Sequence, residues 1–124
     1  MSIPPTLGRL ILVDDDPGVR NALRFTFETD GYDVVAFGSG EELLNDPPRG
    51  ERTCIIIDQR LPGLSGLDTL ARLRAIGVAP PAILITSHPS AFVRRRAREA
   101  DIDIVEKPLL GNLLPLKVVE VLRR

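Results

Sequence analysis

The sequence has very few of the residues that build metal centres from sulfur and nitrogen ligands. Its 124 residues include one cysteine, Cys54, and one histidine, His88. A zinc-type site needs a cluster of such side chains, so this class of site is excluded. Cys54 lies within an apolar run, and we interpret it as a small core residue of a protein from a reducing compartment rather than as a reactive thiol.

Excess charge and long apolar segments are also missing. The formal net charge is −1, so there is no general electrostatic attraction to nucleic acid, and we expect no direct nucleic-acid binding. No apolar run approaches the roughly 20 residues of a membrane span, and residues 1–8 lack the apolar segment of a secretory signal. We therefore expect a soluble cytoplasmic domain that does not bind membranes.

The residues that are present alternate between strand-like and helix-like patterns five times. A length of 124 residues suits one domain, which we assign to 1–124 with 1–8 as a loose N-terminal lead-in. Asp16 followed by Pro17 is a typical helix start, and Gly31 is a typical helix end. Strands are expected at 10–13, 32–37, 53–58, 82–85 and 102–106. Each is followed by a helix, and these helices begin near Pro17, Ser39, Ser65, Ala91 and Leu113.

This alternation predicts an α/β fold with a five-stranded parallel sheet. Strands that are almost wholly apolar need cover on both faces, so we expect helices on both sides of the sheet. In such open sheets, ligands bind beyond the carboxyl ends of the strands, where the strand order reverses. Polar residues at strand ends are therefore the first candidates for a functional site.

Each chemically promising residue ends or follows an expected strand, and the five are Asp14, Asp15, Asp58, Thr86 and Lys107. Two carboxylates about 4 Å apart repel by about 4 kcal/mol at an effective dielectric near 20, so three acids at one edge call for a cation. Oxygen ligands without histidine or cysteine favour Mg²⁺. Lys107 and Thr86 could bind phosphate oxygens, and Asp58 could act as a nucleophile that forms an aspartyl phosphate.

Each of these residues has a simpler interpretation when it is taken alone. Paired Asp residues are common in loops, Asp58 could belong to a turn or a helix cap, and Thr86 or the Lys107–Pro108 step could be structural. Their occurrence together at the strand ends favours the functional interpretation. The remaining polar candidates are interpreted as a helix cap, Asp16, or as solvent-exposed residues: His88, Asp101 and Asp103.

Four motifs together carry a specific resemblance to a known family. They are LVDDDPGVR, IIIDQRLPGLSGLD, ILITSH and VEKP. From Arg9 to its end, the chain resembles the response-regulator receiver domains of bacterial two-component signalling. The resemblance implies a flavodoxin-like (βα)5 fold with strand order 2-1-3-4-5.

The resemblance also implies a role for each strand-end residue. Asp58 would accept a phosphoryl group from a histidine kinase or a histidine phosphotransfer protein. Asp15, Asp58 and the backbone carbonyl of Arg60 would bind Mg²⁺ directly, and Asp14 would bind it through a water molecule. The phosphoryl oxygens would be held by two further residues: Thr86 and Lys107.

Further family features fall on nearby positions. The Lys107–Pro108 peptide bond would be cis. Arg60 and His88 occupy two variable positions that, in the family, tune how long the phosphoryl group survives. The domain would then be a phosphoacceptor with slow autodephosphorylation rather than an enzyme.

The chain departs from the family pattern at Ile104. The family usually has Tyr or Phe three residues before the conserved Lys, as a side chain that swings inward on activation. An aliphatic side chain cannot act in this way, so the readout at Ile104 must differ. The helix expected at 91–100 has a thin apolar face and an arginine cluster, which is either a solvated face or a partner surface. We expect signalling, and a homodimer could form, through the face made by this helix, the fifth strand and the last helix.

Several alternatives stay open at this point. A small Mg²⁺-dependent phosphohydrolase with an Asp nucleophile would usually carry a second Asp two residues later, where this chain has Arg60. Three Asp residues after the first strand oppose a flavin-phosphate site, and the intact strand-end set opposes a degenerate receiver that acts only as a protein-interaction module. The sequence fits both a stand-alone receiver and a fragment of a longer regulator, and it does not identify the cognate kinase.

Overall fold

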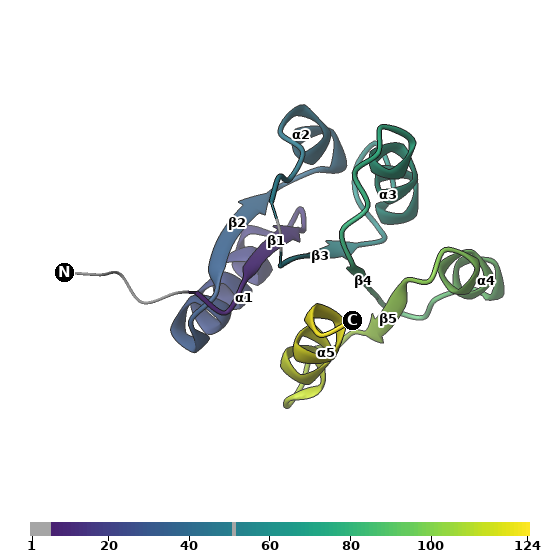
Figure 1. The fold of residues 1–124 in the computed structure, drawn as a ribbon. Helices are drawn as coiled ribbons and strands as arrows, with labels where there is room; N and C mark the ends of the chain where they lie inside the picture. The colour runs from purple at the N-terminus through teal and green to yellow at the C-terminus, as the bar shows by residue number, and fades with distance from the viewer. Residues whose placement is uncertain (1–5, 51) are drawn as a thin grey trace.

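The computed structural model describes residues 6–50 and 52–124 (Figure 1). Residues 1–5 of the expected lead-in lie outside this part of the chain, whereas the amide of Leu7 donates a hydrogen bond to the carbonyl of Gly31 at 3.1 Å. Strands and helices alternate in the order β1 (Arg9–Val13), α1 (Pro17–Asp30), β2 (Asp33–Phe37), α2 (Gly40–Asn45), β3 (Thr53–Asp58), α3 (Gly66–Ala75), β4 (Ala82–Thr86), α4 (Ala91–Glu99), β5 (Asp103–Glu106) and α5 (Leu113–Leu122).

The strands form one parallel sheet in the order β2-β1-β3-β4-β5. The predicted α/β class and strand order are therefore confirmed. Val13 lies opposite Ile57, so the chain leaves β1 and β3 at the same edge of the sheet. Asp58 lies opposite Ile85, which places Thr86 one residue beyond that pair on the neighbouring strand.

Helices cover both faces of the sheet, as Figure 1 shows with α2 and α3 on one side of the strands and α1 and α5 on the other. Side chains of β3 alternate between the two cores: Cys54 and Ile56 face the core shared with α1 and α5, whereas Ile55 and Ile57 face the core shared with α2, α3 and α4. All residues of β3 are buried. This central strand thus reads as a continuous apolar run because neither of its faces meets water.

Local signals in the sequence fix the start of most helices. The Oδ1 atom of Asp16 accepts hydrogen bonds from the amides of Gly18 and Val19, and Pro17 opens α1. Hydroxyl groups cap three further helices by accepting a hydrogen bond from an amide in the first turn; they belong to Ser39, Ser65 and Ser90. These caps satisfy amides that have no partner within the helix.

Two strands begin one residue later than predicted. The amide of Tyr32 donates to the carbonyl of Phe27, and the amide of Ile102 donates to the carbonyl of Ala97. Both residues therefore close the preceding helix before the strand starts. Their apolar side chains are buried all the same, which is why the sequence pattern extends past the helix end.

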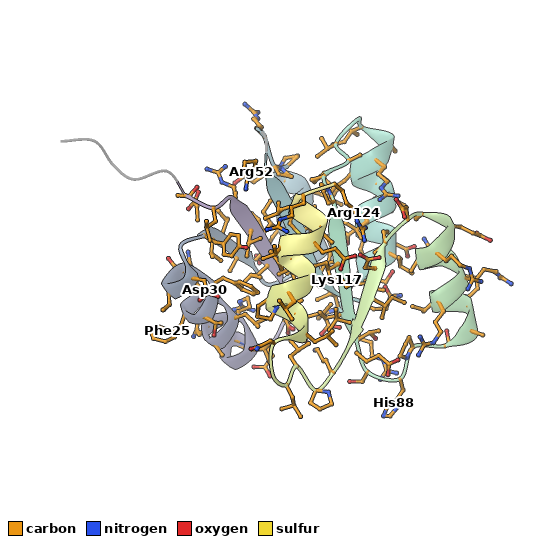
Figure 2. All side chains as sticks on the ribbon, turned by 60° about the horizontal axis from the view of Figure 1, so that its bottom comes forward. Phe25, Asp30, Arg52, His88, Lys117 and Arg124 are labelled. Carbon is orange, nitrogen blue, oxygen red and sulfur yellow. The ribbon has the colours of Figure 1, made fainter. Side chains whose placement is uncertain are left out.

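Asp103 is not the solvated charge that the sequence suggested. It is half-buried on β5, and its Oδ2 atom lies 2.9 Å from Nη2 of Arg124 and 4.0 Å from Nζ of Lys117. Figure 2 labels both of these cations at α5. The acid therefore links β5 to α5 and to the C-terminal residue that follows it through two ion pairs.

Within the described residues, none of the helices has the length and hydropathy that crossing a bilayer requires.

Candidate functional site

Three carboxylates meet at the carboxyl edge of the sheet. Asp58 ends β3, and Asp14 and Asp15 follow β1 directly. One oxygen atom from each carboxylate lies within 4.8 Å of the other two. Asp14 and Asp58 are buried, whereas Asp15 is exposed to solvent. Solvent therefore reaches this set of carboxylates at Asp15, whereas Asp14 and Asp58 are shielded from it.

Lys107 reaches this group from the end of β5. Its Nζ atom lies 2.7 Å from Oδ2 of Asp58 and 3.5 Å from Oδ2 of Asp14. Its amide donates to the carbonyl of Thr86 at 2.9 Å, which ties the ends of β4 and β5 together. The Lys107–Pro108 peptide bond is cis, as the resemblance implied.

The remaining candidate residues surround this group at different depths. Thr86 is buried at the end of β4. Arg60 contributes its main chain, because its amide donates to Oδ1 of Asp58 at 3.0 Å, whereas the residue as a whole is exposed. His88 is exposed, and Figure 2 shows it projecting outward at the rim of the molecule. The structure thus gathers the acids and Lys107 closely and leaves His88 at the periphery.

The electrostatics of the group follow from this geometry. Burial is the largest influence on Asp14 and raises the pKa of its carboxyl group, although the amide of Asp16 and the charge of Lys107 act in the opposite direction. Burial alone would lower the pKa of Lys107, but the hydrogen bond and charge of Asp58, together with Asp14, outweigh it and raise that pKa. One ammonium group therefore pairs with two of the three carboxyl groups, and negative charge remains for a further cation to neutralise.

Sequence reasoning missed the residues that hold the surrounding loops. Nη1 of Arg20 donates to the carbonyl of Asp14 at 2.6 Å. Oε1 of Gln59 accepts from the amide of Leu67 at 2.9 Å and so caps α3. Gly66 allows α3 to approach β3, because a Cβ atom there would lie 2.5 Å from the carbonyl oxygen of Asp58. A glycine directly before a helical pattern was the one signal for such a close approach.

Comparison with known proteins identifies the family. The sequence profile of the response regulator receiver domain matches residues 10–118. The chain belongs to this family. The receiver domain is accordingly a signalling domain of two-component systems rather than a conventional enzyme.

Relatives and solved structures agree with this assignment. Nodulation protein W of Bradyrhizobium diazoefficiens is 35% identical over 93% of the receiver domain, and the transcriptional regulatory protein FixJ of the same organism is 28% identical over 96%. The structure of the response regulator StyR superposes with a TM-score of 0.86 at 28% identity, covering 94% of this chain and 59% of that one. FixJ-N superposes with a TM-score of 0.80 at 28% identity, covering 93% of this chain and 92% of that one.

The receiver domain spans about half the length of the curated relatives it matches. The match covers 51% of nodulation protein W and 58% of FixJ.

Proposed function

We propose that the receiver domain accepts a phosphoryl group on Asp58, from a histidine kinase or a histidine phosphotransfer protein, in a Mg²⁺-dependent reaction. The observation that carries the proposal is that the carboxylates at the ends of β1 and β3 meet beside Lys107 at one edge of the sheet. As a member of a two-component family, the domain would meet such donors in the cytoplasm.

The donor atoms of the site suit Mg²⁺. They are carboxylate oxygens within 4.8 Å of one another, and hard oxygen ligands in small number are what Mg²⁺ prefers. Asp15, Asp58 and the carbonyl of Arg60 would bind the ion directly, with Asp14 acting through water. Bound Mg²⁺ would neutralise negative charge on the oxygens of the transferring phosphoryl group.

The protein's own residues would divide the remaining work. An oxygen of Asp58 would form a bond to phosphorus while the bond between phosphorus and the donor atom breaks, and the leaving group would keep that electron pair. The ammonium group of Lys107, which already lies 2.7 Å from Asp58, would form an ion pair with a phosphoryl oxygen. The hydroxyl of Thr86 would donate to another phosphoryl oxygen.

The new charge would then shift the receiver domain between two conformers. We propose that Thr86 and Lys107 are drawn toward the phosphoryl group and that α4, β5 and α5 carry the change to a partner or to a second copy of the chain. Ile104 on β5 would contribute through packing, because it has neither the ring nor the hydroxyl of the usual aromatic residue.

Intact-mass measurement with acetyl phosphate tests the proposal. In the presence of Mg²⁺ the protein should gain one phosphoryl group, and this gain should disappear in Asp58→Asn and on removal of Mg²⁺ with EDTA. Asp16→Asn is the matched control, since Asn also caps helices well and residue 16 lies outside the acid group; this variant should still be phosphorylated. Absence of any gain under all donors would show a receiver that no longer takes phosphate, and continuous release of phosphate from a monoester would indicate a phosphohydrolase.

A further inference from the structure

Glu41 lies in the first turn of α2 and contacts the loop that follows β3. We propose that Glu41 is a positioning residue for the metal site: its carboxylate anchors the loop after β3 and so fixes the carbonyl of Arg60. This inference rests on the function proposed above, because it assumes that Arg60 supplies a ligand.

The contact between Glu41 and the loop is close on two counts. Oε2 of Glu41 accepts a hydrogen bond from the amide of Leu64 at 3.3 Å. A Cβ atom built at Gly63 would overlap with the same oxygen, and Gly63 has a left-handed φ of 76°. The loop therefore approaches the carboxylate closely at a position that only glycine fills without strain.

The first turn of α2 is itself firmly held. A Cβ atom on Gly40 would overlap with the Thr69 side chain, so α2 packs directly against α3 at this point. Oε2 of Glu42 accepts from the amide of Gly38 at 2.9 Å, and the Ser39 hydroxyl accepts from the amide of Glu42 at 3.1 Å. Glu41 thus projects from a fixed turn, not from a mobile one.

That turn also leads back to the first acid of the site. Gly38 follows Phe37, the last residue of β2, whose carbonyl accepts from the amide of Asp14 at 3.2 Å. A continuous path of hydrogen bonds and short chain segments therefore runs from Asp14 through α2 to Leu64. The path connects the loop after β1 with the loop after β3.

The loop after β3 depends on this support over its middle. It is anchored at one end where the amide of Arg60 meets Asp58, and at the other where the amide of Gly66 donates to the carbonyl of Gln59. Leu64 lies between these anchors, and Glu41 holds it there. Residues that orient metal ligands typically change metal affinity by about 10–100-fold when they are removed.

Three variants separate anchoring from charge. Glu41→Ala removes both the charge and the acceptor, whereas Glu41→Gln removes the charge but keeps an acceptor oxygen. Asp46→Asn is the control, because it removes an exposed carboxylate from the end of the same helix, outside the path that leads to the loop. Mg²⁺ affinity is measured by isothermal titration calorimetry.

The proposal predicts an ordered series of affinities. Glu41→Ala should raise the Kd for Mg²⁺ by about tenfold, Glu41→Gln by clearly less, and Asp46→Asn should stay near the unsubstituted protein. If Glu41→Ala matches Glu41→Gln or the Asp46→Asn control, the effect is only one of charge or does not exist, and the proposal is overturned.

A second measurement needs no metal. In the metal-free protein, hydrogen exchange at the Leu64 amide should be faster in Glu41→Ala than in Glu41→Gln, because the amide loses its acceptor. Equal rates would overturn the anchoring role. If the unsubstituted protein binds no Mg²⁺ at all, the proposed function fails, and the exchange comparison still decides whether Glu41 holds the loop.

Discussion

Asp14 is a residue that the proposed site needs but that lowers the stability of the folded protein. Its carboxyl group is buried beside Asp58, and burial raises its pKa above the ordinary value of 3.8. The folded protein therefore keeps a proton on Asp14 over a pH range in which the unfolded chain has released it. Stability consequently falls as the pH rises through that range.

Replacing this acid should stabilise the metal-free protein. Asp14→Asn removes the buried charge, and its side-chain oxygen can still accept from the amide of Asp16, as Asp14 does at 2.9 Å. We expect the free energy of unfolding in EDTA to rise by about 1 kcal/mol, measured by urea unfolding at neutral pH. Stabilisation of the variant by added Mg²⁺ should be weaker than that of the unsubstituted protein.

Asp46→Asn provides the control, because Asp46 is an exposed carboxylate at the end of α2. A stability gain of equal size in this control would attribute the effect to net charge. A loss of stability in Asp14→Asn would contradict the conflict described above.

The residues of the site differ in how far the sequence could predict their positions. Asp14, Asp58 and Lys107 each end or follow an apolar strand, and the parallel topology then brings them to one edge. Glu41 and Arg20 could not be predicted in this way. Each binds a main-chain group of a loop through a long side chain, and the spacing between partners follows no helical or strand period.

Among the elements, α4 combines a thin apolar face with ion pairs to its surroundings. Ala97 is its buried residue, whereas α3 buries Leu67, Leu70 and Leu73. Two partly exposed ion pairs join α4 to its surroundings, Arg94–Glu106 and Arg96–Asp68. Such pairs contribute about 0.2–1 kcal/mol each, against about 1.5–3 kcal/mol for a buried leucine. Packing should therefore hold α4 more weakly than α3.

Hydrogen exchange under native conditions should reveal this difference. We expect the amides of α4 to exchange faster than those of α3, and added salt to accelerate exchange in α4 more than in α3, because salt screens exposed ion pairs. Nuclear magnetic resonance resolves the two helices in one sample, so α3 is the internal control. Equal protection of both helices would contradict the weaker packing of α4.

Element boundaries were predictable to within one residue where a capping signal coincides with the change of pattern. Asp16 and Gly31 bound α1 as expected. Tyr32 and Ile102 were assigned to strands because a buried apolar residue looks the same whether it closes a helix or opens a strand. Asp103 was misassigned for a related reason, since its partner Lys117 lies in a helix that begins ten residues later and its partner Arg124 follows that helix.

At the scale of the whole molecule, Cys54 reports on the integrity of the sheet. It lies on the central strand, is fully buried, and burial is the main cause that raises the pKa of its thiol to about 12, with Asp103 adding to the effect. A thiol reagent needs the thiolate and access to it. While the two cores stay packed against β3, the thiol of Cys54 remains protonated and inaccessible to the reagent.

Labelling of Cys54 should therefore follow global unfolding. At mildly alkaline pH the native protein should react with a thiol reagent only as fast as it unfolds, whereas the protein in denaturant should react at once. Because an unperturbed thiol ionises near 9.0 and the folded one near 12, stability should fall as the pH rises between these values. Rapid labelling under native conditions would mean that β3 becomes accessible without global unfolding.

The claim on which the whole account depends is that Asp58 receives the phosphoryl group, and chemical trapping tests it most directly. Borohydride reduces an aspartyl phosphate to homoserine, which peptide mass spectrometry locates in the sequence. After treatment with acetyl phosphate and Mg²⁺, the account predicts homoserine at position 58 and nowhere else, with none formed when EDTA replaces Mg²⁺. Homoserine at position 14 or 15, or its absence from every position after a measured gain in mass, would contradict the account.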